Sequence, residues 1–164
     1  MKYKIILTGL LLGFCSLMIA CSGNPVETGA TELTVTTKFE ENRAIFNMRI
    51  NAGFINKSTD VVVTGYAGSL RIINDESEKT LFSFPVRVER LMPMESVEVV
   101  LNATGSEKEF RPLFDLMAID MDQVIKSGEA GPIILNEAYV KIEDQTYSKV
   151  PVVTYLEETT NEDK

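Results

Sequence analysis

The strongest constraint on the fold is a two-residue alternation of apolar and polar side chains that recurs along most of the chain. It is clearest over residues 42–56, where one set of alternate positions is apolar and the other is polar. Successive side chains of a β-strand point to opposite faces, so the pattern predicts strands of an antiparallel sheet with one buried face. The apolar positions are Phe46, Met48, Ile50, Ala52 and Phe54, and the polar ones are Asn47, Arg49 and Asn51.

Turn-forming residues divide the chain into further alternating segments. Residues 56–60 and 74–78 contain Asn, Asp and Ser, which favour turns. The segment between them predicts a strand that bends at Gly65 or Gly68, because glycine within a strand often marks a bulge. The remaining predicted strands cover residues 33–37, 82–88, 97–101, 134–142 and 146–156, and a turn at residues 143–145 joins the last two into a hairpin.

The period of the apolar residues changes once, over residues 110–125. Their spacing there fits one face of an amphipathic helix. Pro112 suits the first turn of such a helix, and Ser127-Gly128 supplies its end. About seven strands and one helix near residues 110–126 predict a mainly β fold, an immunoglobulin-like antiparallel β-sandwich. The helical apolar positions are Phe110, Leu113, Phe114, Met117, Met121 and Val124.

The first 21 residues carry the pattern of an exported protein. Two lysines precede an apolar stretch of about 16 residues, which is shorter than the roughly 20 of a membrane-spanning helix. The sequence LMIAC at residues 17–21 resembles the lipobox of bacterial lipoproteins, with Met18 where leucine is usual. We therefore expect cleavage before Cys21 and a lipid on its thiol, which holds a protein stably to a bilayer when it carries two or three acyl chains. An ordinary signal peptide or a short anchor that contains a cysteine is the alternative.

These patterns divide the chain into four parts. We expect a signal peptide over residues 1–20, a lipidated cysteine with a flexible tether over residues 21–31, the sandwich over residues 32–156 and an acidic tail over residues 157–164. Loss of the signal peptide removes two lysines and no acid, which leaves 14 basic against 24 acidic residues. Nucleic acid and anionic headgroups repel such a domain, so we expect no nucleic-acid partner.

The residue types that are missing restrict the chemistry. The chain has no histidine, which removes the usual general base and the usual zinc ligand. Its only cysteines are Cys15, which leaves with the signal peptide, and Cys21, whose thiol is acylated. No thiol then remains for a disulfide or for nucleophilic catalysis. We expect a non-enzymatic protein without a metal or a cofactor.

The order of the segments resembles the LEA14-like family, the late-embryogenesis-abundant type 2 domain that is also the water-stress and hypersensitive-response domain. The resemblance rests on the sequences FINKSTDVVVTGYAGSLRI, RLMPMESVEVVLNA and KVPVVTY, and it covers roughly residues 32–156. Lys57 departs from the proline that the family carries after the asparagine. The resemblance implies a seven-stranded sandwich with a helix across one end and no catalytic residues. It also suggests envelope stress tolerance or binding at a membrane surface.

Several side chains are candidates for a site. Tyr139, Tyr147 and Tyr155 predict a binding patch near the final hairpin, although ordinary strand packing explains them as well. Met92 and Met94 could offer thioether ligands to copper, but copper sites usually include histidine. The carboxylates of Asp115, Asp120 and Asp122 suit a solvated helix face better than a calcium cage. The glycosylation sequons at Asn56 and Asn102 are expected to be chance matches.

Three functional classes follow. The first is a membrane-anchored envelope lipoprotein that acts as a protein-interaction or stress-related module. Ser22 after the cysteine favours the outer membrane or its periplasmic face over the inner membrane. The second is a carrier of lipid or another hydrophobic ligand, which needs an apolar cavity between the sheets or under the helix. The third is an enzyme that uses carboxylates alone, which the absence of tryptophan for stacking on a sugar disfavours.

Overall fold

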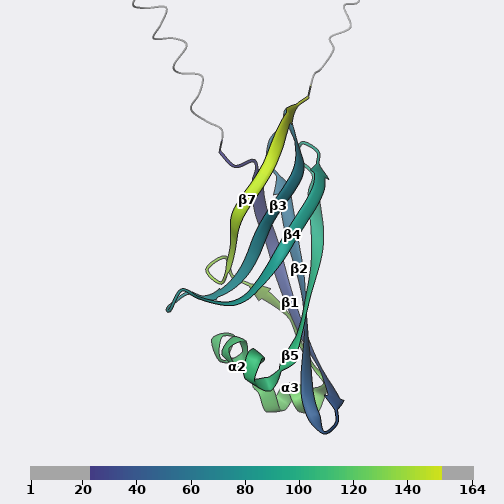
Figure 1. Ribbon diagram of the computed structural model, residues 1–164, viewed down its shortest axis with the longest axis vertical. Coiled ribbons are helices and arrows are strands. Elements are labelled where there is room, and N and C mark those ends of the chain that lie inside the picture. Colours follow the sequence, from purple (N-terminus) through teal and green to yellow (C-terminus); the bar gives the residue numbers. More distant parts are fainter. Residues whose placement is uncertain (1–22, 153–164) are drawn as a thin grey trace, which may run out of the picture.

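The computed structural model describes residues 23–152, in which seven strands form two antiparallel sheets around one core. One sheet has the strand order β5-β2-β1-β6, and the other has the order β4-β3-β7 (Figure 1). This arrangement confirms the predicted mainly β sandwich. The elements are β1 (Val26–Glu40), β2 (Arg43–Asn56), β3 (Val61–Asn74), β4 (Lys79–Leu91), β5 (Ser96–Ser106), α2 (Glu107–Leu116), α3 (Met121–Ser127), β6 (Glu129–Leu135) and β7 (Val140–Pro151).

Two hairpins and three crossings between the sheets produce this topology. In the β1–β2 hairpin, Glu41 and Asn42 occupy a two-residue turn with φ of 48° and 64°. Positive φ at both positions is the type I′ geometry, whose twist matches that of the flanking strands. β3 and β4 form the second hairpin. The chain crosses from one sheet to the other after β2, after β4 and after β6.

The inner face of the four-stranded sheet is covered partly by the three-stranded sheet and partly by helices. At one end, Phe54 of β2 packs against Tyr66 of β3, with ring centroids 5.6 Å apart. At the other end, Phe46 of β2 packs against Phe110 and Phe114 of α2, at 5.7 and 5.2 Å. One strand therefore carries both halves of the core.

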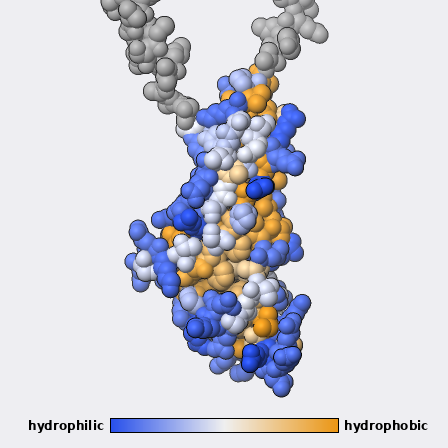
Figure 2. All heavy atoms as spheres, in the orientation of Figure 1, coloured by the Kyte–Doolittle hydropathy of each residue, from blue (hydrophilic) through white to orange (hydrophobic). Residues whose placement is uncertain are grey.

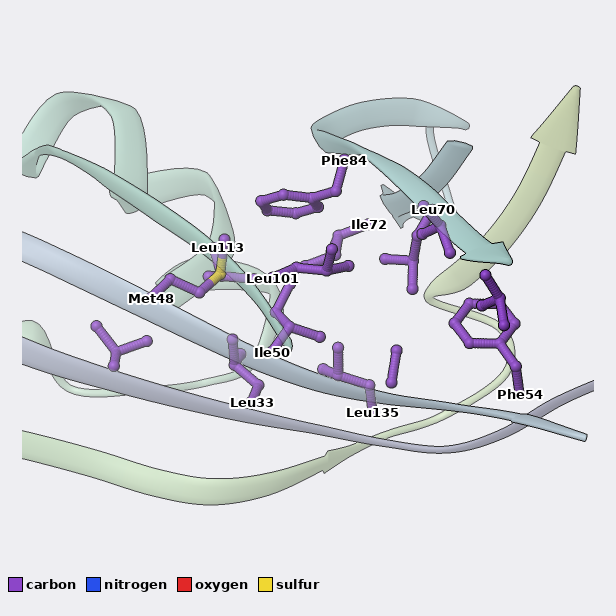
Figure 3. Packing of buried hydrophobic residues seen from close by; sticks show 14 of the residues in the cluster. Leu33, Met48, Ile50, Phe54, Leu70, Ile72, Phe84, Leu101, Leu113 and Leu135 are labelled. Carbon is purple, nitrogen blue, oxygen red and sulfur yellow. The ribbon is translucent and has the colours of Figure 1, made fainter. Parts of the chain in front are cut away.

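The apolar positions of β2 point into this core, as the alternation predicts. Figure 3 shows Met48 of β2 close to Leu113 of α2, and Ile50 beside Leu101. The burial of every apolar position on this face confirms the phase assigned from the sequence: Phe46, Met48, Ile50, Ala52 and Phe54 are all at most 1% exposed.

The first and last described residues lie at the same end of the sandwich, opposite the helices (Figure 1). The Lys57 N–H donates to the Pro25 carbonyl at 2.7 Å, and the Val152 N–H donates to the Asp60 carbonyl at 2.8 Å. We call this the terminal end; it comprises residues 23–25, 57–60, 92–95 and 149–152. Within residues 23–152, no helix has the length and apolar character needed to cross a membrane. The predicted signal peptide, Cys21 and the acidic tail lie outside the described residues.

The single helix predicted near residues 110–126 is in fact two helices. α2 begins five residues before Pro112, at a capping box in which the Glu109 carboxylate accepts from the Ser106 N–H at 2.7 Å. The chain leaves the helical conformation at Ala118, whose φ is 52°. The Asp120 carboxylate then caps α3 by accepting from the backbone of Asp122 at 3.0 Å. The helical spacing of apolar residues continues across this break, so the sequence pattern alone predicts one helix.

The predicted hairpin between residues 134–142 and 146–156 is wrong. β6 pairs with β1 in the four-stranded sheet, whereas β7 pairs with β3 in the other sheet. Residues 136–139 therefore connect the two sheets. The predicted turn at residues 143–145 lies inside β7, where Asp144 has φ of 54° and the register against β3 shifts. Polar residues with positive φ occur in both bulges and turns, so only the pairing of the flanking strands shows which of the two is present.

β1 begins at Val26, inside the segment over residues 21–31 predicted as a flexible tether. Val26 pairs with Asn56, and the register then shifts between Thr28 and Thr31. This irregularity interrupts the two-residue period, which is why the start of the strand resembles a polar linker. Ordered structure therefore extends to within a few residues of Cys21.

Candidate functional site

The centre of the outward face of the four-stranded sheet carries mostly amide and hydroxyl side chains. The register places Thr104, Asn47 and Thr36 in one row across β5, β2 and β1, and Asn102, Arg49 and Thr34 in the next. The following row includes Asn51. We call these seven residues the amide face: Thr34, Thr36, Asn47, Arg49, Asn51, Asn102 and Thr104.

Two hydrogen bonds join side chains within the amide face, and Arg49 and Asn102 are exposed to a partner. The Thr104 hydroxyl donates to the Asn47 Oδ1 at 2.8 Å, and the Arg49 Nε donates to the Asn51 Oδ1 at 3.2 Å. The Asn47 Nδ2 is buried and has no hydrogen-bond partner among the described residues. The face is hollowed: all seven residues border a shallow depression of about 590 Å³. A second depression of about 410 Å³ adjoins it, where glycines of β1 and β2 leave space above the sheet.

Exposed apolar side chains border the amide face. Val100 of β5 lies opposite Asn51 in the register and is 44% exposed. Ile134 of the edge strand β6 lies opposite Glu32 of β1 and is 64% exposed. A polar centre with apolar side chains beside it offers both directional hydrogen bonds and area to bury.

The outward face of the three-stranded sheet is different, because it carries an ion-pair cluster around Arg71. Arg71 of β3 contacts Glu143 at 2.5 Å and Asp144 at 3.7 Å. Lys141 lies opposite Arg71 in the register, and Arg87 is exposed on β4. Arg49 is the one charged residue of the amide face, and Glu32 and Glu129 lie at its border, opposite Asn51 and Thr36 in the register. This contrast makes the amide face the stronger candidate for a contact surface.

A buried amide organises the terminal end. The Asn56 side chain is fully buried, and its Nδ2 donates to the carbonyls of Val61, Leu91 and Met92 at 2.8, 3.2 and 3.0 Å. Its Oδ1 accepts from the Ser58 N–H at 3.0 Å. One side chain thus joins the β2–β3 loop to the β4–β5 loop. An Asn56 held in this way has no free amide for a glycan, whereas Asn102 of the second sequon is exposed.

A second polar connection joins the start of the chain to the three-stranded sheet. The Gln145 Oε1 accepts from the Asn24 Nδ2 at 2.5 Å and from the Tyr66 hydroxyl at 3.3 Å. The Tyr66 side chain is 2% exposed. This burial, together with repulsion from ionised Tyr147, raises the pKa of Tyr66 to about 12.

The structure does not bring together the two described residues of the predicted tyrosine patch. Tyr147 is half-buried and stacks on Tyr66 inside the sandwich, with ring centroids 6.1 Å apart. Tyr139 lies in the turn before β7, eight residues or roughly 25 Å along the chain. The bulge in β7 reverses the phase of the strand, which turns Tyr147 inward although the alternation places it outside. Tyr155 lies outside the described residues.

The other candidates take ordinary positions. Met92 and Met94 are exposed in the β4–β5 turn, and Asp120 caps α3. Among residues 23–152 no group of three or more Asp, Glu, Cys or His side chains is placed to hold a metal ion. Sequence analysis identified Asn47, Arg49 and Asn51 as outward-facing but missed the amide face, whose local signal was the two amides on either side of Arg49.

Comparisons with protein-family models, with curated proteins and with solved structures find no match for this chain. The resemblance to the LEA14-like family therefore stays a prediction. The candidate surfaces rest on the geometry of the described residues and on the sequence alone.

Proposed function

We propose that this protein is a non-enzymatic lipoprotein of the cell envelope, anchored through Cys21, whose sandwich binds an envelope protein through the amide face. The observation that carries the proposal is the composition of that face: amides and hydroxyls around a single arginine, in a strongly acidic chain. Protein interfaces are depleted in charged residues at their centre but enriched in arginine. Arg49 is exposed in the middle row, where it can act as an anchor for the partner.

The packing of the core supports an interaction module more than a carrier. An acyl chain or other apolar ligand needs an internal chamber lined by apolar side chains. Here the space between the sheets is filled by side chains from both, and the space under α2 is filled by Phe46, Phe110 and Phe114. The depressions found on residues 23–152 lie on the surface and include polar residues in their lining.

The location is part of the proposal and comes from the sequence. The charged start, the apolar stretch and the lipobox-like LMIAC favour export and acylation, and Ser22 favours the outer membrane or its periplasmic face. Membership in the LEA14-like family, with a role in envelope stress, is a further part. The resemblance implies a seven-stranded sandwich with one helix across an end, and the seven strands in two sheets support this part of the proposal.

Photo-crosslinking in cells tests the interaction. A photoreactive amino acid at Asn102 should capture one recurring envelope protein, whereas the same amino acid at Arg87 should not, because Arg87 faces outward from the other sheet. Arg49→Ala should weaken binding of the captured protein about tenfold or more, and Arg87→Ala should leave it unchanged. Equal capture from both positions, or equal effects of the two arginine variants, would contradict this use of the amide face.

A separate variant tests the anchor. Cys21→Ser removes the thiol that accepts the lipid, so acyl labelling should disappear and unprocessed precursor should accumulate. Normal processing and continued membrane retention of this variant would show that the anchor has been wrongly assigned.

A further inference from the structure

Exposed apolar side chains gather at the terminal end. Of seven large hydrophobic residues that are strongly exposed among those described, four lie in two segments at this end. The two segments adjoin one loop, because the Met94 N–H donates to the Ser58 carbonyl at 3.1 Å and the Val152 N–H donates to the Asp60 carbonyl at 2.8 Å. Figure 2 shows hydrophobic residues at this tip. The four are Met92 (41% exposed), Met94 (63%), Val150 (48%) and Val152 (45%).

The backbone at Met94 adds a second observation. The Glu95 N–H donates to the Met92 carbonyl at 3.1 Å, which closes a β-turn with Pro93 and Met94 at its centre. Met94 has φ of 60°, and positive φ at the third position of a turn favours glycine or asparagine. A bulky apolar residue therefore occupies a strained and exposed position at the tip of the turn. Folding alone does not explain this choice.

The distance to the predicted lipid is short. Pro25 is buried and its carbonyl accepts from Lys57, and the Asn24 side chain binds Gln145. Cys21 precedes Asn24 by three residues, which span at most about 11 Å. The headgroup layer on each side of a bilayer is about 5–8 Å thick. A lipid on Cys21 therefore brings the terminal end to the level of the headgroups.

Charge at this end differs from the acidic average of the chain. Lys57 and Lys149 border a depression of about 420 Å³ beside Gly23 and Asn24. The residues of this end carry two lysines against two acids, Asp60 and Glu95, so their charges balance. The Lys57 Nζ lies 3.4 Å from the Glu27 carboxylate, in an ion pair whose two side chains are both more than half exposed. The net charge repels an anionic bilayer at long range, but the two lysines complement lipid phosphates at contact.

We propose that the terminal end is a membrane-contact surface: Met92, Met94, Val150 and Val152 enter the headgroup boundary of a phospholipid bilayer, with Lys57 and Lys149 at the lipid phosphates. The inference rests on the proposed acylation of Cys21. It fixes the orientation of the domain, because the helices and the β1–β2 hairpin then point away from the membrane. The amide face lies along the side of the sandwich and stays open to a partner.

Fluorescent labelling of the lipidated full chain tests the contact. Once Cys21 is acylated and the signal peptide is gone, an introduced cysteine is the single free thiol. Met94→Cys is labelled with an environment-sensitive dye in vesicles of phosphatidylethanolamine and phosphatidylglycerol that contain a spin-labelled lipid. Phe39→Cys is the matched control, because Phe39 is 62% exposed at the opposite end. Val150→Cys provides a second test site in β7.

We expect the spin-labelled lipid to quench the dye at positions 94 and 150 several-fold more than at position 39. Equal quenching at all three positions overturns the membrane contact. A dye at position 94 that is shielded from water but not quenched by lipid also overturns it and indicates a protein at this surface. Acyl labelling and flotation of the same samples separate the two proposals. Failure to float contradicts the anchor, whereas flotation with a water-exposed Met94 contradicts the contact surface alone.

Discussion

At the helix end of the domain, Phe46 of β2 lies against two aromatic rings of α2, whereas at the terminal end Asn56 of the same strand donates to three backbone carbonyls. Both side chains are fully buried, and both attach a neighbouring segment to β2. The aromatic contact depends on filling volume, while the amide contact depends on pairing polar groups that are buried or partly buried. β2 is therefore held to its neighbours by aromatic packing at one end and by the hydrogen bonds of a buried amide at the other. Truncating the side chains that make these two contacts should reduce stability to different extents.

The largest effect is expected at the helix end. Phe110→Ala removes a ring that contacts Phe46 and Phe82 at 5.7 and 5.2 Å. Loss of a fully buried aromatic side chain leaves a cavity and lowers the free energy of unfolding by about 3–5 kcal/mol. Urea unfolding of the purified protein measures this change. Phe39→Ala at the exposed hairpin tip is the control and should change stability by less than about 0.5 kcal/mol. Similar losses in the two variants would place Phe110 outside the core.

The terminal end should respond to one amide. Asn56→Ala leaves the buried carbonyl of Leu91 and the partly buried carbonyls of Val61 and Met92 without this donor, which lowers the free energy of unfolding by about 2–3 kcal/mol. The same urea titration measures it, with Asn51→Ala on the outward face as the matched control. If both asparagine variants unfold alike, the Asn56 hydrogen bonds do not hold the loops together.

A smaller effect should follow from uncapping α3. Asp120→Ala removes the carboxylate that accepts from the backbone N–H groups of Asp122 and Gln123, which lowers the free energy of unfolding by about 1 kcal/mol. Asp115→Ala on the exposed surface of α2 should have little effect. An equal response of the two aspartates would show that the helix break does not depend on this cap.

Much of this two-ended core was predictable from the alternation. The inward phase of β2 and the apolar face of the helical region follow from side-chain periods that the backbone imposes. The wrong predictions fall at local irregularities of the backbone. Ala118 and Asp144 adopt positive φ although neither is glycine, and the register of β1 shifts near Thr28. Tertiary contacts hold these irregularities in place, so the local sequence carries no clear signal of them.

The amide face shows the same limit at the level of the site. The alternation places Asn47, Arg49 and Asn51 on the outside of β2. Their neighbours Thr34 and Asn102 come from β1 and β5, and the order of strands in a sheet is set by long-range pairing. The composition of a face made from three strands therefore becomes visible only when the pairing is known.

The smallest effect concerns Tyr66. Its hydroxyl donates to the Gln145 Oε1, which also accepts from Asn24 of the terminal end. At neutral pH, Tyr66→Phe loses one hydroxyl hydrogen bond, which costs about 0.5–1 kcal/mol. The larger signature is in the pH dependence. Burial and ionised Tyr147 raise the pKa of Tyr66 from its ordinary value of about 10 to about 12, so the folded protein keeps this proton at a higher pH than the unfolded chain.

The sign of the pH effect follows from this difference in proton binding. The stabilisation linked to protonated Tyr66 is complete below pH 10 and is lost as the pH rises from about 10 to about 12. Urea titrations across this range should show a steeper loss for the native protein than for Tyr66→Phe, which has no phenol to ionise at this position. If stability falls with pH in the same way for both proteins, the Tyr66 hydroxyl is accessible to solvent. Its hydrogen bond to Gln145, and through it the link to Asn24, would then not be buried.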